Sequence, residues 1–115
     1  MELSVQFSFS AGHSLPEYHG PCSRFHGHNY GLVVTVAGKP DARTGMIIDF
    51  EELKKIVAES AIAHVDHQNL NDFIPNPTAE NIVAVLWARL KGRLPGLKEL
   101  KLYETPEYWV AYRGD

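Results

Sequence analysis

Two histidines and a cysteine lie close together in the stretch from Cys22 to His28, which reads CSRFHGH. If this part of the chain is extended, His26 and His28 project to the same face, because side chains alternate along a strand. Two imidazoles aimed at one point provide half of a metal site, and Gly27 leaves room for close approach. The alternative is a pair of surface histidines that hydrogen-bond to neighbouring loops.

A third histidine, His13, ends the strand that is predicted to precede this stretch. Apolar residues alternate with polar ones from residue 3 onward, the period-two pattern of a strand. A second strand is predicted from His26 to residue 37, so the two form an antiparallel pair with a long loop over residues 14–25. The ends of such a hairpin adjoin, and all three imidazoles can converge. Three histidines with an open fourth position are typical of catalytic zinc sites.

The single cysteine, Cys22, lies in the predicted loop, beside Pro21, Ser23 and Arg24, which are not typical of a buried core. A lone cysteine is usually a small buried apolar residue. Here a nearby cation, either Arg24 or a metal, would favour the thiolate form. A thiolate beside a metal can serve as a fourth ligand, a nucleophile or a general base, and the spacing does not choose among these roles.

Two further groups can move protons or hold a ligand. Asp66 and His67 form a candidate acid–base pair, because a carboxylate commonly orients the second ring nitrogen of a histidine. Asp66 can instead cap a helix end. Glu104 has the parity of two leucines that are predicted to face the core, so its carboxylate points inward and needs a partner. That partner is either Arg113 or a ligand with paired N–H donors, such as an aminopyrimidine edge.

The remaining pattern predicts two helices and two more strands. One helix begins at Asp49 and runs to about residue 63, and the other is opened by Asn76-Pro77, with Asn76 as the N-cap. Strands follow over residues 97–105 and 108–112. The order β-β-α-α-β-β predicts an α+β fold with both helices on one face of a four-stranded antiparallel sheet. Such a sheet leaves two edges, so we expect an oligomer that pairs them across subunits.

The composition indicates a single domain, residues 1–115, with one core. A net charge of −3 argues against nucleic-acid binding, which requires a clustered basic face. No apolar run approaches the ~18 residues of a membrane span, so we expect no membrane contact. One cysteine cannot form an internal disulfide, which favours a reducing, cytoplasmic setting.

The chain resembles the 6-pyruvoyl tetrahydropterin synthase / 6-carboxytetrahydropterin synthase family over nearly its whole length. Each segment that carries the resemblance is weak alone, but together, in this order and spacing, they are specific. These segments are FSAGH (9–13), Cys22-x3-His-Gly-His, GMIIDF (45–50), VDHQNLN (65–71), NPTAEN (76–81) and Glu104-Thr105.

The resemblance implies a zinc cofactor held by His13, His26 and His28. It also implies that Cys22 is a general base, that Asp66 and His67 transfer protons, that Glu104 holds the pterin ring and that Thr78 lies along the pterin edge. The implied architecture is the T-fold, in which subunits join their sheets into a barrel as a trimer. Two trimers then stack into a homohexamer with active sites between subunits.

The gap of three residues between Cys22 and His26 resembles that of the bacterial 6-carboxytetrahydropterin synthases of the queuosine pathway. The animal pyruvoyl enzymes tend to have a longer gap. The implied reaction converts 7,8-dihydroneopterin triphosphate to 6-carboxy-5,6,7,8-tetrahydropterin, acetaldehyde and triphosphate. The alternatives are a 6-pyruvoyl tetrahydropterin synthase, a dihydroneopterin side-chain lyase for folate synthesis, and a non-catalytic module that binds zinc or pterin. The proton-transfer groups argue against such a module, which does not need them.

Overall fold

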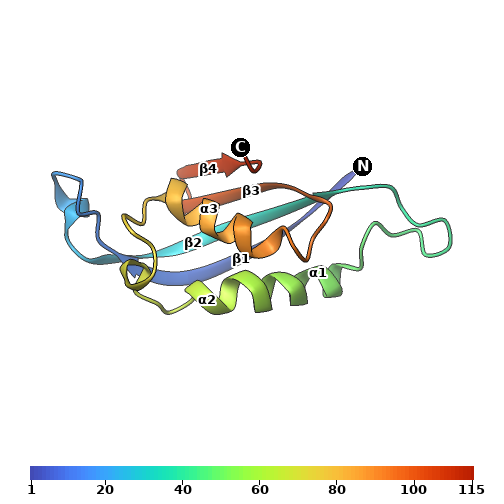
Figure 1. Ribbon diagram of the computed structural model, residues 1–115, viewed down its shortest axis with the longest axis horizontal. Coiled ribbons are helices and arrows are strands. Elements are labelled where there is room, and N and C mark those ends of the chain that lie inside the picture. Colours follow the sequence, from blue (N-terminus) through green and yellow to red (C-terminus); the bar gives the residue numbers. More distant parts are fainter.

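A four-stranded antiparallel sheet runs along the molecule, with its strands in the order β1-β2-β3-β4 (Figure 1). The computed structural model describes residues 1–115, which extend 54 Å along the longest axis. The strands are β1 (Glu2–His13), β2 (His26–Ala37), β3 (Leu97–Thr105) and β4 (Tyr108–Tyr112). β1 and β2 pair without interruption from Glu2 opposite Ala37 to His13 opposite His26. The predicted long hairpin is therefore confirmed.

One continuous helical segment follows the hairpin, composed of α1 (Phe50–Val57), a π-helical turn (Ala58–Ile62) and α2 (Ala63–Val65). Asp49 caps it as predicted, because its carboxylate accepts a hydrogen bond from the Glu51 amide at 2.9 Å. The segment ends two residues later than expected.

The π-helical turn explains how this segment keeps one face on the sheet. Its fully buried residues recur every four positions, at Leu53, Val57, Ala61 and Val65. In a pure α-helix of 3.6 residues per turn, side chains four positions apart are rotated about the helix axis by about 40° relative to each other, so a row of them would gradually turn away from the sheet. The wider turn from Ala58 to Ile62 opposes that drift.

The second long helix, α3 (Ala79–Leu90), begins later than predicted. Its N-cap is Thr78, whose hydroxyl accepts from the Asn81 amide at 3.2 Å, so the prediction that Asn76 caps the helix is wrong. Asn76 instead adopts a left-handed conformation with φ 49°, and its carbonyl accepts from the Asn81 side chain. A turn through Asn76 and Pro77 therefore precedes the helix.

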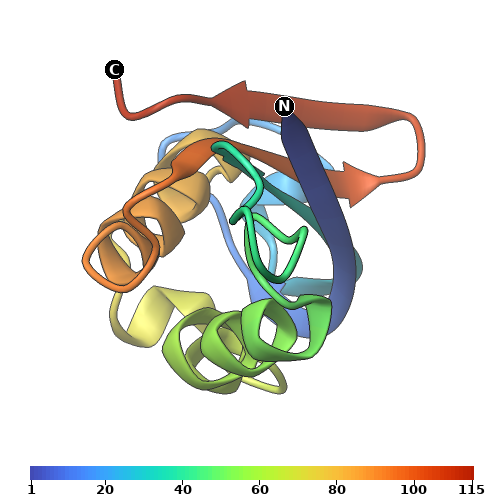
Figure 2. The ribbon, with the colours of Figure 1, turned by 90° about the vertical axis from the view of Figure 1, so that its right-hand side faces the viewer.

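The helices cover one face of the sheet and leave the other face without a helix (Figure 2), as predicted. The buried core lies between the two layers and includes Leu32 and Leu100 from the strands and Leu53 and Leu86 from the helices. Phe50, at the start of α1, remains 55% exposed and is not part of this core. None of the helices has the length and apolarity that crossing a bilayer requires.

The segment that follows α2 lies along the free edge of β1. The His67 amide donates to the Ser10 carbonyl at 2.6 Å, and the Gly12 amide donates to the Gln68 carbonyl at 3.0 Å. One turn on, the Asn71 side chain binds both the amide and the carbonyl of Ser14, at 2.8 and 2.9 Å. These contacts hold the Asp66–His67 segment against the strand that ends in His13.

Candidate active site

Three imidazoles and one carboxylate converge at one end of the sheet, from His13, His26, His28 and Glu104. Their ligand atoms all lie within 4.8 Å of one another. His13 and His26 face each other across β1 and β2, and His28 lies two residues further along β2, so strand alternation places all three rings on the same face. His13 is fully buried, and the other three are partly buried.

Backbone carbonyls set the orientation of two of these rings. The Nδ1 atom of His13 donates to the Pro77 carbonyl at 2.7 Å, and the Nδ1 atom of His26 donates to the Arg24 carbonyl at 2.7 Å. Each Nε2 atom then carries a free lone pair, and the two Nε2 atoms lie 3.0 Å apart. Two lone pairs at this distance repel each other unless a cation lies between them. A hydrogen bond from one ring nitrogen to a backbone carbonyl is typical of histidines that bind a metal through the other ring nitrogen.

The third imidazole has an unsatisfied nitrogen. His28 Nε2 is buried without a hydrogen bond, although it lies 3.0 Å from Glu104 Oε1. Burial lowers the pKa of His28, against the opposing effect of the Glu104 carboxylate, and so favours the neutral form that binds metals.

The separations of the donor atoms fit a divalent cation. Ligand bonds of about 2.0–2.1 Å in a tetrahedral zinc site place the donor atoms about 3.3–3.4 Å apart. The separation of 3.0 Å between His13 and His26 and that of 3.8 Å between His13 and Glu104 bracket this value. The donor set therefore fits a small divalent metal ion.

Glu104 reaches this cluster from an irregular position in β3. The pairing between β3 and β4 shifts register between Tyr103 and Thr105, so Glu104 lies at a bulge, which can re-aim a side chain. Arg113, one of its two predicted partners, pairs instead with Glu99 at 2.6 Å. That predicted salt bridge is wrong.

Asp66 and His67 form a close carboxylate–imidazole pair. Asp66 Oδ2 lies 3.0 Å from His67 Nδ1, while Asp66 Oδ1 accepts from the Ser10 amide at 3.0 Å. The Ser10 amide, and then His67, hold the pKa of Asp66 below its usual range. His67 has φ 59°, a left-handed conformation uncommon for a residue other than glycine, and its side chain is 81% exposed. The Asp66 carboxylate thus orients an accessible imidazole.

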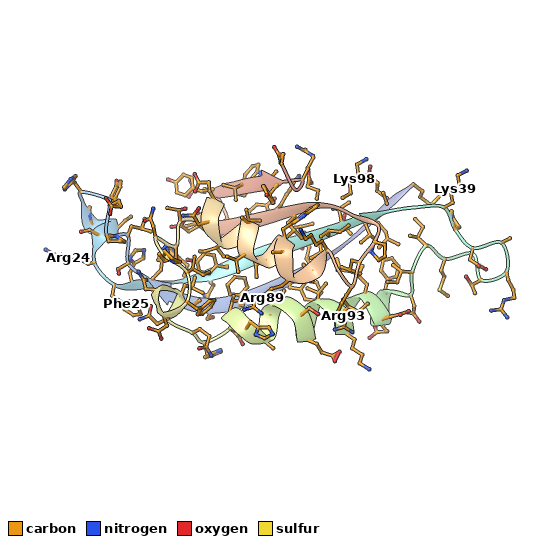
Figure 3. All side chains as sticks on the ribbon, viewed as in Figure 1. Arg24, Phe25, Lys39, Arg89, Arg93 and Lys98 are labelled. Carbon is orange, nitrogen blue, oxygen red and sulfur yellow. The ribbon has the colours of Figure 1, made fainter.

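A cavity of about 500 Å³ connects this pair with the cluster, since both His67 and His28 line it. Gly12 and Gly27 lie opposite each other in its wall, and the ring of Phe25 covers Gly12 so closely that a Cβ there would lie 2.3 Å from the ring. Figure 3 shows Phe25 at this end of the molecule and Lys39 at the opposite end.

Cys22 lies on a separate element, the 3₁₀ turn Pro21–Ser23, and is partly buried. Its sulfur does not belong to the converging group of His13, His26, His28 and Glu104. Two residues further on, the Arg24 carbonyl binds the His26 ring. Within one chain, Cys22 is therefore neither a member of the metal cluster nor hydrogen-bonded to His67.

The supporting groups that the sequence analysis missed are the carbonyls of Pro77 and Arg24 and the side chain of Asn71. Thr78, which was predicted to lie along a ligand, follows Pro77 directly and uses its hydroxyl to cap α3. Asn71 is the last residue of the VDHQNLN segment (65–71), but no pattern in the sequence indicates that its side chain binds the backbone of Ser14.

Replacing Thr78 with alanine is expected to lower the free energy of unfolding by about 1 kcal/mol, since a helix loses its N-cap hydroxyl. Urea denaturation measures this, and Thr78→Ser should retain wild-type stability because it keeps the hydroxyl. Equal stability of the alanine variant and the wild type would contradict the capping role.

The family described as 6-pyruvoyl tetrahydropterin synthase matches residues 2–115. The chain belongs to this family and is an enzyme with its T-fold, as the sequence motifs predicted. It is 36% identical over 113 residues to a putative 6-carboxy-5,6,7,8-tetrahydropterin synthase of Archaeoglobus fulgidus, covering 98% of this chain and 96% of that one. It is 37% identical over 133 residues to 6-pyruvoyl tetrahydrobiopterin synthase of Pongo abelii, covering 99% and 92%.

The fold agrees closely with a solved structure. The 6-pyruvoyl tetrahydropterin synthase of Caenorhabditis elegans superposes with a TM-score of 0.91 at 29% identity and covers 100% of this chain and 96% of its own.

Proposed function

We propose that this enzyme converts 7,8-dihydroneopterin triphosphate and water to 6-carboxy-5,6,7,8-tetrahydropterin, acetaldehyde and triphosphate, as a cytoplasmic step in queuosine biosynthesis. The observation that carries the proposal is the convergence of three imidazoles beside a cavity that His67 also lines. The substrate would be a small molecule, and no nucleic acid or membrane is needed.

The proposed roles follow from the chemistry of each group. Zinc, held by His13, His26 and His28, would supply Lewis acidity toward the side-chain hydroxyls of the substrate. Cys22, as a thiolate, removes a proton from the side chain, and His67, oriented by Asp66, returns protons to it.

The pterin ring requires a separate recognition site. The Glu104 carboxylate accepts the paired N–H donors of its aminopyrimidine edge, and Thr78 lies along the same edge. A bidentate carboxylate contact of this kind fixes the plane of the ring as well as its position.

The carboxy product is favoured over the pyruvoyl product by the short gap between Cys22 and His26 and by the lengths of the alignments. The alignment with the Pongo abelii pyruvoyl enzyme extends over 133 positions, so at least 18 of them have no counterpart among the 115 residues here. The alignment with the archaeal carboxy enzyme extends over 113 positions. The difference between these two alignments supports the carboxy product.

Product analysis tests the proposal. The zinc-loaded enzyme is incubated with 7,8-dihydroneopterin triphosphate, and the products are separated by chromatography. Acetaldehyde together with a carboxypterin is the expected result. A 6-pyruvoyl product would favour the alternative, a 6-pyruvoyl tetrahydropterin synthase, to which the close structural match with the nematode enzyme also points. Failure to release triphosphate would reject both reactions.

We also propose that the enzyme is a homohexamer whose sheets join into a barrel. β1 and β4 are the edge strands of an open sheet, and edges of this kind can pair between copies of the chain. Cys22 does not line the cavity that His67 and His28 share within one chain, which supports sites that combine groups from two subunits.

Mixing two inactive variants tests this shared site. Cys22→Ala and His67→Ala are each expected to be inactive alone, and to regain activity after they are unfolded and refolded together. If one subunit supplies Cys22 and its neighbour supplies His67, about a quarter of the sites in a random mixture contain both groups. Recovery of about that fraction of wild-type kcat is expected. No recovery, with oligomers reformed, would place both groups in one chain.

A further inference from the structure

One aromatic contact joins the loop that carries Cys22 to the sheet. We propose that Phe25 is a positioning residue, whose ring packs against Gly12 and so fixes where this loop, residues 14–25 (the cysteine loop), presents the Cys22 thiol. The proposal rests on the function proposed above for Cys22, because a general base must lie within reach of the proton that it removes.

The cysteine loop takes no part in the hydrophobic core. It projects beyond the end of the sheet (Figure 1), and none of its residues is buried. Residues 15–23 form backbone hydrogen bonds only within the loop, such as that from the Leu15 amide to the Cys22 carbonyl at 3.1 Å. The place of the loop relative to the sheet therefore depends on contacts at its two ends.

Hydrogen bonds hold both ends of the cysteine loop. At one end, the Asn71 side chain binds the amide and the carbonyl of Ser14 at 2.8 and 2.9 Å. At the other end, the His26 ring binds the Arg24 carbonyl at 2.7 Å. A loop held at two ends can still swing about the line that joins them, as a flap does. A contact away from that line is needed to fix the angle between the loop and the sheet.

The Phe25 ring provides this contact. Alternation places the imidazoles of His13 and His26 on the helix-covered face of the sheet, so Gly12, next to His13, faces the other way. A Cβ on Gly12 would lie 2.3 Å from Cζ at the tip of the Phe25 ring, so the ring occupies space that any other residue would fill. Gly12 does not have a positive φ, so its backbone does not require glycine. The ring does.

The 3₁₀ turn Pro21–Ser23 transmits this position to the thiol. The Arg24 amide donates to the Pro21 carbonyl at 3.2 Å, so the segment between Cys22 and Phe25 is closed by its own hydrogen bond and moves as a unit. Loss of the Phe25 ring would let this unit swing. The thiol would lose its defined position, while the three imidazoles on the other face of the sheet would keep theirs.

Alkylation of the thiol tests the proposal without any pterin. Cys22 is the only cysteine, so its rate of reaction with iodoacetamide, followed by intact mass, reports on this loop alone. Because the thiol is partly buried, a freed loop exposes it. We expect Phe25→Ala to react about tenfold faster than the wild type, which corresponds to about 1.4 kcal/mol. Phe25→Leu, which keeps an apolar side chain, should react at nearly the wild-type rate. A rate in Phe25→Ala equal to or below that of the wild type, with both folded by circular dichroism, would overturn the proposal.

Gly12→Ala changes the same contact from the other side, because the new Cβ displaces the ring. It should accelerate alkylation as much as Phe25→Ala does, and the double variant should react no faster than either single variant, since both remove one interaction. Tyr18→Ala is the matched control. The Tyr18 ring is 50% exposed and packs on Gly20 within the same loop, so it does not join the loop to the sheet. Additive effects in the double variant, or equal acceleration in Tyr18→Ala, would overturn the contact with Gly12 as the cause.

Turnover distinguishes this proposal from the proposed function. A shift of about 1 Å in a reacting group can cost about 100-fold in rate, so Phe25→Ala should lose about 10- to 100-fold in kcat. Its zinc content and KM should stay near the wild-type values, and Phe25→Leu should restore kcat. An unchanged kcat in Phe25→Ala, or a changed KM alone, would overturn the positioning role and leave the proposed function intact. If the wild type forms neither product, the proposed function fails, whereas alkylation still decides whether Phe25 holds the loop.

Discussion

His26→Ala is expected to lose its bound metal and, with it, nearly all turnover. His26 is one of three imidazoles in the cluster, and its ring is held by the Arg24 carbonyl so that its Nε2 atom faces that of His13 at 3.0 Å. Mutation of a residue that only hydrogen-bonds to a metal ligand lowers metal affinity by about 10- to 100-fold. Removal of the ligand itself should therefore lower metal affinity by more than about 100-fold. Metal content after dialysis and kcat measure the two effects.

The matched control for this variant is His64→Ala. His64 is an exposed histidine on α2 and does not belong to the cluster, so its replacement removes an imidazole from the chain without touching the site. Metal content should stay at the wild-type value in the control. An unchanged metal content in His26→Ala itself would reject the site built from three histidines.

The sequence was sufficient to predict the convergence of these histidines, because strands have a strict period of two. Once β1 and β2 are paired as a hairpin, His13 and His26 must face each other, and His28 must lie on the same side.

Features that depend on tertiary contacts could not be predicted in this way. The carbonyls of Pro77 and Arg24 orient two rings, but every residue has a carbonyl, so the sequence does not distinguish these two. The parity of Glu104 predicted that it points inward, whereas its proximity to His28 depends on a bulge. Asn76 and Thr78 are both good N-caps by type, and only the fold decides between them.

The sequence also did not show that residues 67–69 would lie along β1. That placement depends on the hydrogen bonds of Ser10 and Gly12, which are available only because β1 is an edge strand. It is nevertheless what aims His67 at the cavity.

Cys22→Ala is expected to bind zinc as the wild type does but to lose about 10²- to 10⁴-fold in kcat, the range typical of removing a general base. The reason is positional. Cys22 does not belong to the converging ligands, so its loss leaves the donor set of His13, His26 and His28 complete. Zinc content, pterin affinity and kcat together separate the role of a base from that of a ligand.

Ser23→Ala is the control for Cys22→Ala, because Ser23 lies in the same 3₁₀ turn and its hydroxyl binds only the Gly20 carbonyl within that turn. A disturbed turn would affect both variants and, through the Arg24 carbonyl, would also loosen His26. Loss of turnover in Cys22→Ala alone, with full zinc content, therefore assigns the effect to the thiol. Loss of zinc in Cys22→Ala would instead make the thiol a ligand, and retained turnover would move the base to another group, with His67 as the first candidate.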